Sequence, residues 1–481
     1  MTKMELPLRR ARTKIVATLG PASDSSTALI EMLAAGSDVF RLNTAHSQPD
    51  DLRRQVEMIR DVGEQVGRSV GILIDLAGPK IRLGQLAEEP LACAEAQQFT
   101  LVRGETSNKP DELTSNYEPL IDEISAGDRV MLADGTVGMM VVKKTANSAT
   151  LVVLAAGEIR SRQGINLPGA RLSIQSPTER DLEFARLAAE LEADFVGLSF
   201  VRSPAEVLRL RTELTEAGSR AMIIAKIEKP EALEHLEAIV DAADGIMVAR
   251  GDLGVEIDVA EIAIVQKRII KLCSEYRKPV IVATQMLESM RSSRLPTRAE
   301  ATDVANAILD GADACMLSGE TAIGEHPSVV VEMMNRIAQA TEPLLAAAPR
   351  PQLVHRERDA VKEITLATIH GASEIARQLK AKMVVVATRS GATAVARAKQ
   401  RGFTRTVGVS GDPQTLRKMS LFWGITPLVG APVDDVAALM QYVDKWGKHE
   451  GTLAPGDRVV HISGAGLVEA AHNQVIVHEV K

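Results

Sequence analysis

The sequence is poor in aromatic residues, which make up 2% of its 481 positions. Proteins that bind single-stranded nucleic acid need stacking side chains of this kind, and a formal net charge of −7 gives no general attraction to phosphate backbones. No apolar run approaches the length of about 20 residues that spans a bilayer. No apolar segment follows the basic start, as it would in a signal peptide. We therefore expect a cytoplasmic protein with neither nucleic acid nor membrane as a partner.

Cysteine is also scarce, and its positions exclude the common metal-binding spacings. The three residues, Cys93, Cys273 and Cys315, are scattered, so we expect buried, reduced thiols. The remaining composition, 45% hydrophobic and 25% charged, is that of an ordinary globular protein. The length is sufficient for about two to four domains.

Eight segments share one form, a short β-branched apolar run followed by small or polar residues. They cover residues 14–20, 38–46, 69–78, 194–200, 222–228, 245–252, 279–285 and 314–320. Helical patterns lie between most of them, and doubly buried strands that alternate with helices are typical of a parallel sheet. Eight such units favour an α/β fold of the (β/α)8 TIM-barrel type. An open, doubly wound sheet is the alternative, although no G-x-G-x-x-G motif follows the first strand.

Two further regions interrupt or follow this repeat. Residues 82–165 contain short strand patterns and the hairpin signal Asp134-Gly135, which predicts a small β-barrel domain inserted after the third strand. An insertion there lies over the C-terminal mouth of the barrel and could close on a substrate as a lid. A Pro-rich, charged linker follows the eighth unit. The predicted domains are the catalytic barrel (1–81 and 166–342), the lid (82–165) and a C-terminal α/β domain (358–481).

The stretch IIAKIEKPEAL begins as a buried strand but continues with Lys226 and Glu228, which alternation places on one face. In a TIM barrel the C-terminal strand ends carry the chemistry. The other polar residues at strand ends are Arg41, Asn43, Asp75, Lys80, Arg82, Arg250, Gly251, Asp252, Thr284, Gln285, Ser318 and Glu320. A single Lys–Glu pair is most often a salt bridge, and a lone threonine could simply cap a helix. The convergence of many polar strand ends on one mouth favours a functional site.

The residue types indicate the chemistry that such a site would support. Glu228 and Asp252 belong to adjacent strands and could share one Mg²⁺ or Mn²⁺ ion, since both offer oxygen ligands. Arg41, Arg82 and Lys226 suit a substrate with several negative charges, such as a phosphate or carboxylate. A carboxylate-bound metal beside such cations predicts phosphoryl transfer or enolate chemistry.

Several longer motifs resemble the pyruvate kinase family: ATLGPAS, GPKIR, KIE, GINLPG, MVARGDLGVEI, ATQMLESM and PTRAEATDVANAILDGADACMLSGETA. The resemblance covers essentially the whole chain and is weakest in the inserted domain and the C-terminal tail. It implies a bacterial-type kinase that transfers the phosphoryl group of phosphoenolpyruvate to ADP, giving pyruvate and ATP, in the last step of glycolysis. It also implies a barrel, a mobile lid and a C-terminal effector domain, usually in a homotetramer.

The resemblance assigns roles to the residues that match the family's motifs. Lys226 would stabilise the transferring phosphoryl group, and Arg41 would bind the phosphate of phosphoenolpyruvate. Thr284 would bind substrate and help to relay the proton to the enolate. The amide of Gly251, at a helix start, suits an anionic substrate group, and Asp252 beside it would also bind substrate.

The resemblance implies the metal and nucleotide positions in the same way. Glu228 and Asp252 resemble the Mg²⁺ ligands of the family. Asn43, His46 and Arg82 resemble residues that contact the nucleotide, ADP or ATP.

Three departures from the family's motifs cluster near the predicted substrate site. Many pyruvate kinases need K⁺, held by an asparagine, a serine, an aspartate and a threonine. The matching positions here are Asn43, Ala45, Asp75 and Leu76, so two oxygen-bearing side chains are missing. Lys80 stands where the family usually has a glutamate, and its ammonium group could take over the electrostatic role of the ion. We therefore predict a K⁺-independent member that still requires Mg²⁺ or Mn²⁺.

The C-terminal domain contains a loop, TRSGAT, that the family uses for phosphorylated effectors. It follows a predicted strand and opens a predicted helix, so Thr388, Ser390, Gly391 and Thr393 could bind a sugar phosphate or a nucleoside monophosphate. An ordinary strand-to-helix turn with a capping residue is the alternative. Elsewhere, Gln163 replaces the lysine that the family has before GINLPG, where the lid contacts the nucleotide, and the tail lacks the usual G-x-T-N segment.

Two rival interpretations stay open on the sequence alone. A metal-dependent lyase or aldolase of the phosphoenolpyruvate/pyruvate type would use the same barrel, Mg²⁺ and an arginine, but it would need no nucleotide site or lid. A catalytically silent protein could instead sense sugar phosphates through its C-terminal domain. An assay with phosphoenolpyruvate, ADP and Mg²⁺ separates all three.

Overall fold

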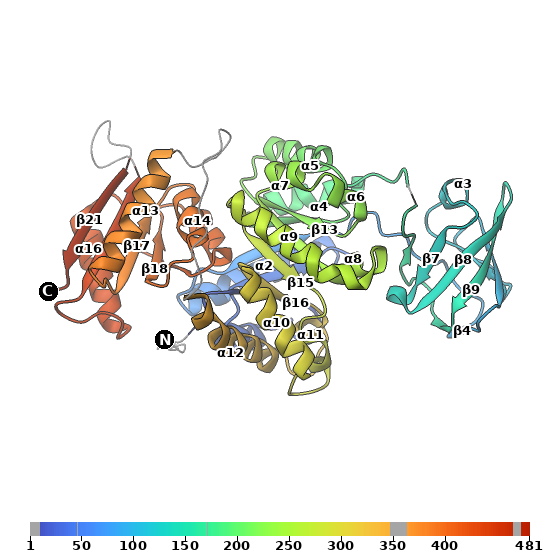
Figure 1. The fold of residues 1–481 in the computed structure, drawn as a ribbon, viewed down its shortest axis with the longest axis horizontal. Coiled ribbons are helices and arrows are strands. Elements are labelled where there is room, and N and C mark those ends of the chain that lie inside the picture. Colours follow the sequence, from blue (N-terminus) through green and yellow to red (C-terminus); the bar gives the residue numbers. More distant parts are fainter. Residues whose placement is uncertain (1–9, 46, 171, 347–362, 465–472) are drawn as a thin grey trace.

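The structure, a computed structural model, describes residues 10–45, 47–170, 172–346, 363–464 and 473–481. Its central body is a closed parallel barrel in the strand order β1-β16-β15-β14-β13-β12-β3-β2, which confirms the predicted TIM barrel (Figure 1). The barrel strands are β1 (Lys14–Thr18), β2 (Val39–Asn43), β3 (Gly71–Asp75), β12 (Phe195–Leu198), β13 (Met222–Ile227), β14 (Gly245–Ala249), β15 (Val280–Ala283) and β16 (Ala314–Leu317). Nearly all of their residues are buried, because the barrel interior covers one face and helices cover the other.

Helices cover the outside of the barrel, and local sequence fixes where several of them begin. The α-helices are α1 (Ser26–Ala35), α2 (Pro49–Gln65), α4 (Glu179–Glu190), α5 (Pro204–Glu216), α6 (Pro230–Glu234), α7 (Leu236–Ala242), α8 (Arg250–Glu256), α9 (Ile262–Glu275), α10 (Arg298–Asp310), α11 (Gly319–Ala322) and α12 (Pro327–Ala346), with the 3-10 turns η2 (Val259–Glu261) and η3 (Glu288–Arg291). Thr178 and Asp181 form a reciprocal capping box at the start of α4, and Thr297 and Glu300 form another at α10. Each box satisfies amide groups that a helix start would otherwise leave unpaired.

The inserted region between β3 and β12 is built mainly from antiparallel strands around its own apolar core. They form a six-stranded sheet, β11-β7-β8-β9-β5-β6, and a two-stranded sheet, β10-β4. The elements are β4 (Leu91–Cys93), β5 (Gln98–Val102), β6 (Glu112–Leu113), α3 (Leu120–Glu123), β7 (Arg129–Leu132), η1 (Ala133–Gly135), β8 (Val137–Lys144), β9 (Ser148–Ala155), β10 (Gly157–Ile159) and β11 (Ile165–Asn166). The turn η1 joins β7 to β8, with Leu132 opposite Val137, so the hairpin predicted at this point is confirmed.

The C-terminal part is an α/β domain, as expected, with a five-stranded sheet in the order β19-β18-β17-β20-β21. All of its strand pairs are parallel except the pair of β21 with β20. The elements are α13 (Glu363–Gln378), β17 (Met383–Ala387), α14 (Ala392–Lys399), β18 (Arg405–Val409), α15 (Pro413–Lys418), η4 (Met419–Leu421), β19 (Ile425–Pro427), α16 (Val436–His449), β20 (Arg458–Gly464) and β21 (Asn473–Glu479).

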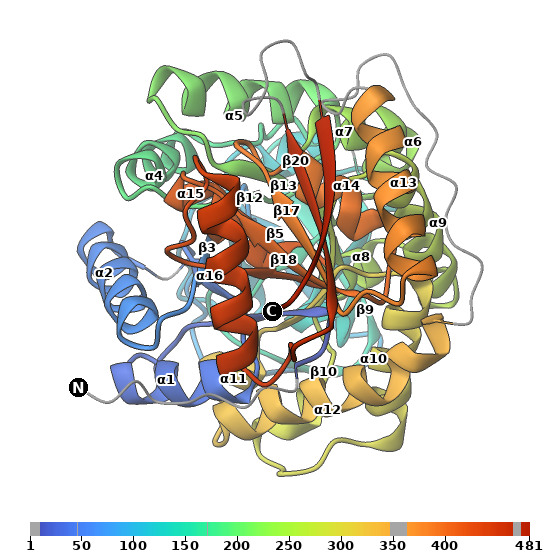
Figure 2. The same cartoon turned by 90° about the vertical axis from the view of Figure 1, so that its left-hand side faces the viewer.

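The C-terminal domain packs against the amino-terminal ends of the barrel strands (Figures 1 and 2). Lys14, the first residue of β1, donates to the carbonyl of Ile425 (2.8 Å). Arg417 pairs with Asp194 (2.8 Å), the residue before β12, and Trp423 joins the apolar core of the barrel interior. The inserted region leaves after β3 and lies on the other side of the barrel in Figure 1. The carboxyl ends of the strands, with their polar side chains, therefore face the inserted region.

The structure also bears on the cysteines and on membrane-spanning segments. The three cysteines are buried and form no disulfide, as expected. Among the described residues, no helix combines the length and the apolar character needed to cross a membrane.

Candidate active site

Four charged side chains at the ends of β2, β3 and β13 meet at the carboxyl end of the barrel. Lys226 Nζ lies 3.0 Å from Glu228 Oε1 and 3.4 Å from Asp75 Oδ2. The same oxygen of Asp75 accepts a hydrogen bond from Arg41 Nε (2.6 Å). The side chains of Asp75 and Glu228 are 1% exposed, and those of Lys226 and Arg41 are 10% and 12% exposed. The result is an alternating row of cations and carboxylates that water hardly reaches.

Burial and neighbouring charges set the protonation of this row. Burial alone would raise the pKa of Asp75, but Lys226 and Arg41 bring it below its ordinary value. Burial likewise opposes the charge of Lys226, yet Asp75 and Glu228 raise its pKa above that of a free lysine. Burial raises the pKa of Glu228, with Asp252 adding to the effect and Lys226 opposing it. Lys226 is therefore held as a cation, while the Glu228 carboxylate would be stabilised by a further positive charge.

Gly251, Asp252 and Thr284 lie next to one another at the ends of β14 and β15. Thr284 follows β15 directly, with φ +69°, and its hydroxyl donates to the carbonyl of Ala283 (2.6 Å). The same oxygen accepts the amide hydrogen of Gly251 (2.6 Å), so in this structure that amide is already paired. Asp252 is in the first turn of α8, and its side chain is 32% exposed. A carboxylate and a hydroxyl are thus available beside the Lys226 row.

The residues at the end of β2 are arranged by local hydrogen bonds. Asn43 Oδ1 accepts the amide hydrogen of Ala45 (3.1 Å). Thr44 Oγ1 donates to the carbonyl of Asp75 (3.1 Å), which ties this turn to the end of β3. Leu76, the residue after Asp75, is completely buried. His46, which the resemblance assigns to the nucleotide, lies outside the described residues.

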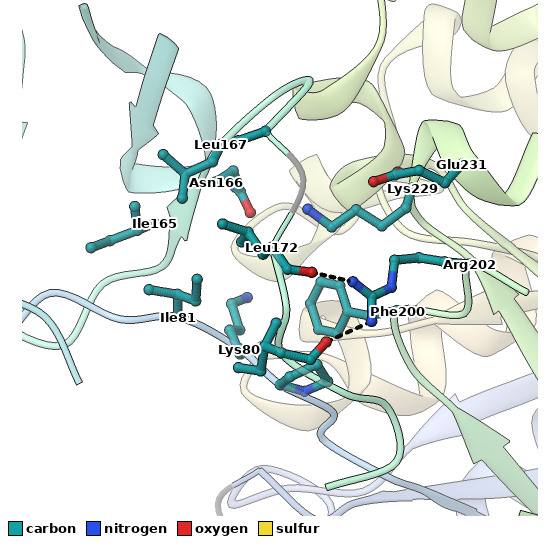
Figure 3. A pocket seen from close by; sticks show the side chains of 13 residues that line it. Lys80, Ile81, Ile165, Asn166, Leu167, Leu172, Phe200, Arg202, Lys229 and Glu231 are labelled. Atoms are coloured by element: carbon teal, nitrogen blue, oxygen red, sulfur yellow. Dashed lines mark hydrogen bonds between the residues drawn. The ribbon is translucent and has the colours of Figure 1, made fainter. Parts of the chain in front are cut away.

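Lys80 and Arg82 lie on the chain that leaves the barrel for the inserted region. Lys80 Nζ is 4.0 Å from Asp252 Oδ1, and its side chain lines a pocket between the barrel and the two connecting segments (Figure 3). Arg82 Nη1 donates to the carbonyl of Arg162 (3.2 Å), and Gln163 Oε1 accepts the amide hydrogen of Arg160 (2.8 Å). Lys80 therefore reaches the strand ends, whereas Arg82 contacts residues of the inserted region.

Two polar residues that follow barrel strands, Arg250 and Glu320, lie outside the charged row. The Arg250 guanidinium pairs with Asp303 (2.7 Å) on α10. The Glu320 carboxylate is buried and accepts the amide hydrogens of Leu287 (3.1 Å) and Ser318 (2.7 Å). Arg250 and Glu320 therefore lie at the same end of the barrel as Lys226, but their partners lie outside the charged row.

The TRSGAT loop connects β17 to α14. Thr388 Oγ1 accepts the amide hydrogen of Gly391 (3.1 Å), which adopts a left-handed conformation (φ +86°) of the kind that glycine allows. Ser390 is exposed, but Thr393 is only 8% exposed. The loop thus offers one exposed hydroxyl at the start of an α-helix.

Sequence reasoning missed two partners of the charged row. Ser199 Oγ accepts a hydrogen bond from Lys226 Nζ (2.7 Å), and the amide of Phe200 donates to Glu228 Oε2 (2.7 Å). Both follow β12, the strand beside β13. A serine and a backbone amide carry no charge, so the only available signal was their position at a strand end of the repeat.

Comparison with known proteins agrees with this geometry. The family described as "Pyruvate kinase, barrel domain" matches residues 10–331, and "Pyruvate kinase, alpha/beta domain" matches residues 366–478. The chain is 40% identical over 471 residues to a pyruvate kinase of Mycobacterium intracellulare, with 98% of each chain covered. It is 41% identical over 468 residues to one of Corynebacterium efficiens, with 97% of each chain covered. It is 39% identical over 452 residues to one of Thermotoga maritima, with 94% of this chain and 96% of the relative covered.

These matches span both the barrel and the C-terminal domain, so they favour the kinase over the lyase or aldolase that the sequence left open. Members of this family generally use Mg²⁺ or Mn²⁺. The chain belongs to the pyruvate kinase family of phosphotransferases, and its reaction is phosphoryl transfer from phosphoenolpyruvate to ADP, giving pyruvate and ATP.

Proposed function

We propose that the row around Lys226 is the place where the phosphoryl group is transferred. The observation that carries this proposal is the burial of the Lys226 ammonium between Asp75 and Glu228, at the end of the barrel that faces the inserted region. Negative charge on the transferring group is best stabilised by cations that are already fixed in a site with little water. Lys226 would supply that charge, and Arg41, fixed through its Nε by Asp75, would bind the phosphate of phosphoenolpyruvate.

Glu228 and Asp252 would hold the divalent ion. Their fit is supported by the effect of Asp252 on Glu228, whose pKa burial and this second carboxylate both raise. No group of three or more His, Cys, Asp and Glu side chains suited to a metal occurs within the ranges that the structure describes. Mg²⁺ commonly takes one or two protein carboxylates and completes its shell with water and substrate phosphates. When bound, the ion would neutralise charge on the phosphoryl oxygens.

Thr284 would bind the substrate and take part in protonating the enolate left after transfer. Its hydroxyl is fixed between the carbonyl of Ala283 and the amide of Gly251, so its orientation is defined before substrate arrives. The Gly251 amide and Asp252 would contribute to the same substrate pocket.

The nucleotide would bind between the barrel and the inserted region. Asn43, His46 and Arg82 are the proposed contacts, and residues 82–165 would form the lid over the barrel domain of 1–81 and 166–342. Gln163 would leave that lid with one cationic contact fewer than its relatives have.

We further propose a bacterial-type, K⁺-independent enzyme in which Lys80 replaces the monovalent ion. The 4.0 Å separation of Lys80 Nζ from Asp252 Oδ1 supports this, since it brings the ammonium group to the proposed metal ligand. A C-terminal domain of residues 358–481 would bind a phosphorylated effector at Thr388, Ser390, Gly391 and Thr393. A cytoplasmic homotetramer is the assembly expected by analogy with the family.

The test compares Lys226→Met with Lys14→Met. Both variants remove a buried lysine from a barrel strand, but Lys14 lies at the opposite end, where it donates to Ile425. Lys226→Met should lower kcat for phosphoenolpyruvate, ADP and Mg²⁺ by about 10²–10³-fold, while Lys14→Met should leave kcat nearly unchanged even if it lowers stability. Turnover near that of the wild type in a folded Lys226→Met protein would refute the role of Lys226.

A further inference from the structure

The four residues that follow β12, Ser199 to Arg202, contact both the charged row and both connections of the inserted region. The outgoing connection begins at Leu76, directly after β3, and the returning connection runs from β11 to α4. None of the catalytic or binding roles proposed for the site residues involves this segment. Its contacts therefore link the position of the inserted region to the position of the charged side chains at the site.

Ser199 lies between Lys226 and the two connections. Its hydroxyl donates to the carbonyl of Leu76 (2.6 Å) and accepts a hydrogen bond from Lys226 Nζ (2.7 Å). Its carbonyl accepts a hydrogen bond from the hydroxyl of Ser176 (2.7 Å) on the returning connection. Because a serine hydroxyl has one hydrogen, the bond to Leu76 leaves a lone pair directed at the lysine. Ser199 is 1% exposed, so water has little access to replace these bonds.

Phe200 connects the same segment to Glu228. Its backbone is in the left-handed region (φ +56°), which a bulky residue rarely adopts, and this conformation accompanies the hydrogen bond of its amide with Glu228 Oε2 (2.7 Å). The ring packs where Gly78 leaves room, since a Cβ at Gly78 would lie 2.7 Å from it. The outgoing connection thus packs directly on the residue that orients Glu228.

Arg202 holds the returning connection. Its guanidinium donates to the carbonyls of Leu172 (2.8 Å) and Ile174 (2.5 Å), as the dashed lines in Figure 3 show. Glu206 on α5 accepts two hydrogen bonds from the same guanidinium (3.1 and 3.2 Å) and keeps it in place. A planar, five-donor group fixed in this way can bind two carbonyls with defined geometry.

We propose that Ser199–Arg202 is a positioning element, in which Ser199 sets the direction of the Lys226 ammonium and Arg202 ties that setting to the returning connection of the inserted region. The proposal rests on the phosphoryl-transfer role proposed for Lys226. A displacement of either connection would move a hydrogen-bond partner of Ser199, and with it the cation that faces the transferring group. Ser199 is a positioning residue here, since it acts through Lys226.

The first experiment compares Ser199→Ala with Ser420→Ala. Ser420 is a buried serine of the C-terminal domain, and its hydroxyl donates to the carbonyl of Ser69 (2.9 Å) in the barrel. Loss of a hydrogen bond to a charged group should lower kcat about 10- to 100-fold in Ser199→Ala, with the KM for phosphoenolpyruvate changed less than about threefold. Ser420→Ala should change neither.

The second experiment tests the connection with Arg202→Lys, which keeps the charge but loses the two-carbonyl contact. Amide hydrogen exchange at residues 172–175 should become faster, and kcat should fall. In the double variant Ser199→Ala/Arg202→Lys the loss should be smaller than the product of the single losses, because the two residues act through one element.

The outcomes of these experiments separate the positioning role from the proposed site. A wild-type kcat in folded Ser199→Ala would overturn the positioning role, and faster exchange in Arg202→Lys with unchanged kcat would overturn the link to the connection. If Lys226→Met itself retains turnover, the proposed site fails first. If Lys226→Met is inactive but Ser199→Ala has normal kcat, the positioning role of Ser199 is refuted while the proposed role of Lys226 stands.

Discussion

Lys399, the last residue of α14, forms an ion pair with Asp313, the residue that precedes β16, and each side chain is 1% exposed. Arg401 approaches the other oxygen of Asp313 (3.2 Å), and the amide of Val280 donates to the oxygen that Lys399 contacts (2.8 Å). The pair therefore joins the C-terminal domain to the amino-terminal end of a barrel strand.

Removing one partner of this buried pair should be costly. Lys399→Met leaves Asp313 with less compensation in a site that water does not reach, and we expect a loss of about 3 kcal/mol. Thermal unfolding followed by calorimetry should show a clearly lower Tm. Lys109→Met, which breaks an exposed pair with Glu112, should change the Tm little. Equal Tm values for the two variants would contradict a stabilising role for the buried pair.

The C-terminal domain should lose stability in mild acid because of His461. Its Nε2 lies 3.1 Å from Nδ1 of His478, whose Nε2 lies 2.8 Å from Asp444. Burial, and then His478, lowers the pKa of His461 to about 3. An unfolded chain would bind this proton at about pH 6.5. The stability that the folded state gains from a neutral His461 is therefore fully present above pH 6.5 and is lost as the pH falls towards 3. The slope should approach about 1.4 kcal/mol per pH unit between these limits.

Tryptophan fluorescence gives a selective measurement of this effect. Both tryptophans of the chain, Trp423 and Trp446, lie in the C-terminal domain, so their emission follows its unfolding. The Tm of His461→Asn should fall less steeply than that of the wild type between pH 6.5 and 5, since the asparagine does not titrate. Parallel curves would show that His461 is not the group responsible.

The barrel and the centre of the site could be predicted because their signals are repeated or periodic. Eight strand units recur along the chain, and the period of two residues placed Lys226 and Glu228 on one side of β13. These two side chains do meet (3.0 Å).

The sequence could not say which polar strand ends turn inward. Arg250 and Glu320 follow barrel strands at the same end as Lys226, yet the partners of Arg250 are Asp303 and the carbonyl of Thr284, and those of Glu320 are backbone amides. Alternation gives the face of a strand, but the direction of a long side chain depends on the neighbouring helix. Ser199 was missed for a related reason, since its contact with Lys226 arises only when β12 and β13 lie side by side.

The proposed effector loop, residues 388–393, provides a further prediction. An aspartate at position 390 places negative charge at the start of α14, which the helix dipole tolerates, but it should repel a phosphate at the same position. Wild-type protein should gain thermal stability with fructose 1,6-bisphosphate, glucose 6-phosphate or AMP, and Ser390→Asp should lose that gain. Ser26→Asp, at the start of α1, is the matched control and should keep it. Absence of any gain in the wild type with all three metabolites would count against an effector site here.

The last prediction concerns the monovalent ion. Of the four positions that would hold K⁺, Ala45 and Leu76 offer no side-chain oxygen, and Leu76 is fully buried. Lys80 brings its ammonium group to within 4.0 Å of Asp252. We therefore expect full Mg²⁺-dependent activity in a buffer of organic cations without Na⁺ or K⁺, measured as the initial rate of pyruvate formation. Added K⁺ should raise that rate less than about twofold, because a hard cation needs several oxygen ligands.

Variants at Lys80 make this prediction specific. Lys80→Glu should lower kcat/KM by about 10²–10³-fold, and K⁺ should not restore it, because Ala45 and Leu76 still lack oxygen ligands. The triple variant Lys80→Glu/Ala45→Ser/Leu76→Thr should regain activity with K⁺ and lose it again in the organic-cation buffer. Stimulation of the wild type by tenfold or more would show that a working K⁺ site survives without those ligands. Lys80 would then be a neighbour of the site and not a substitute for the ion.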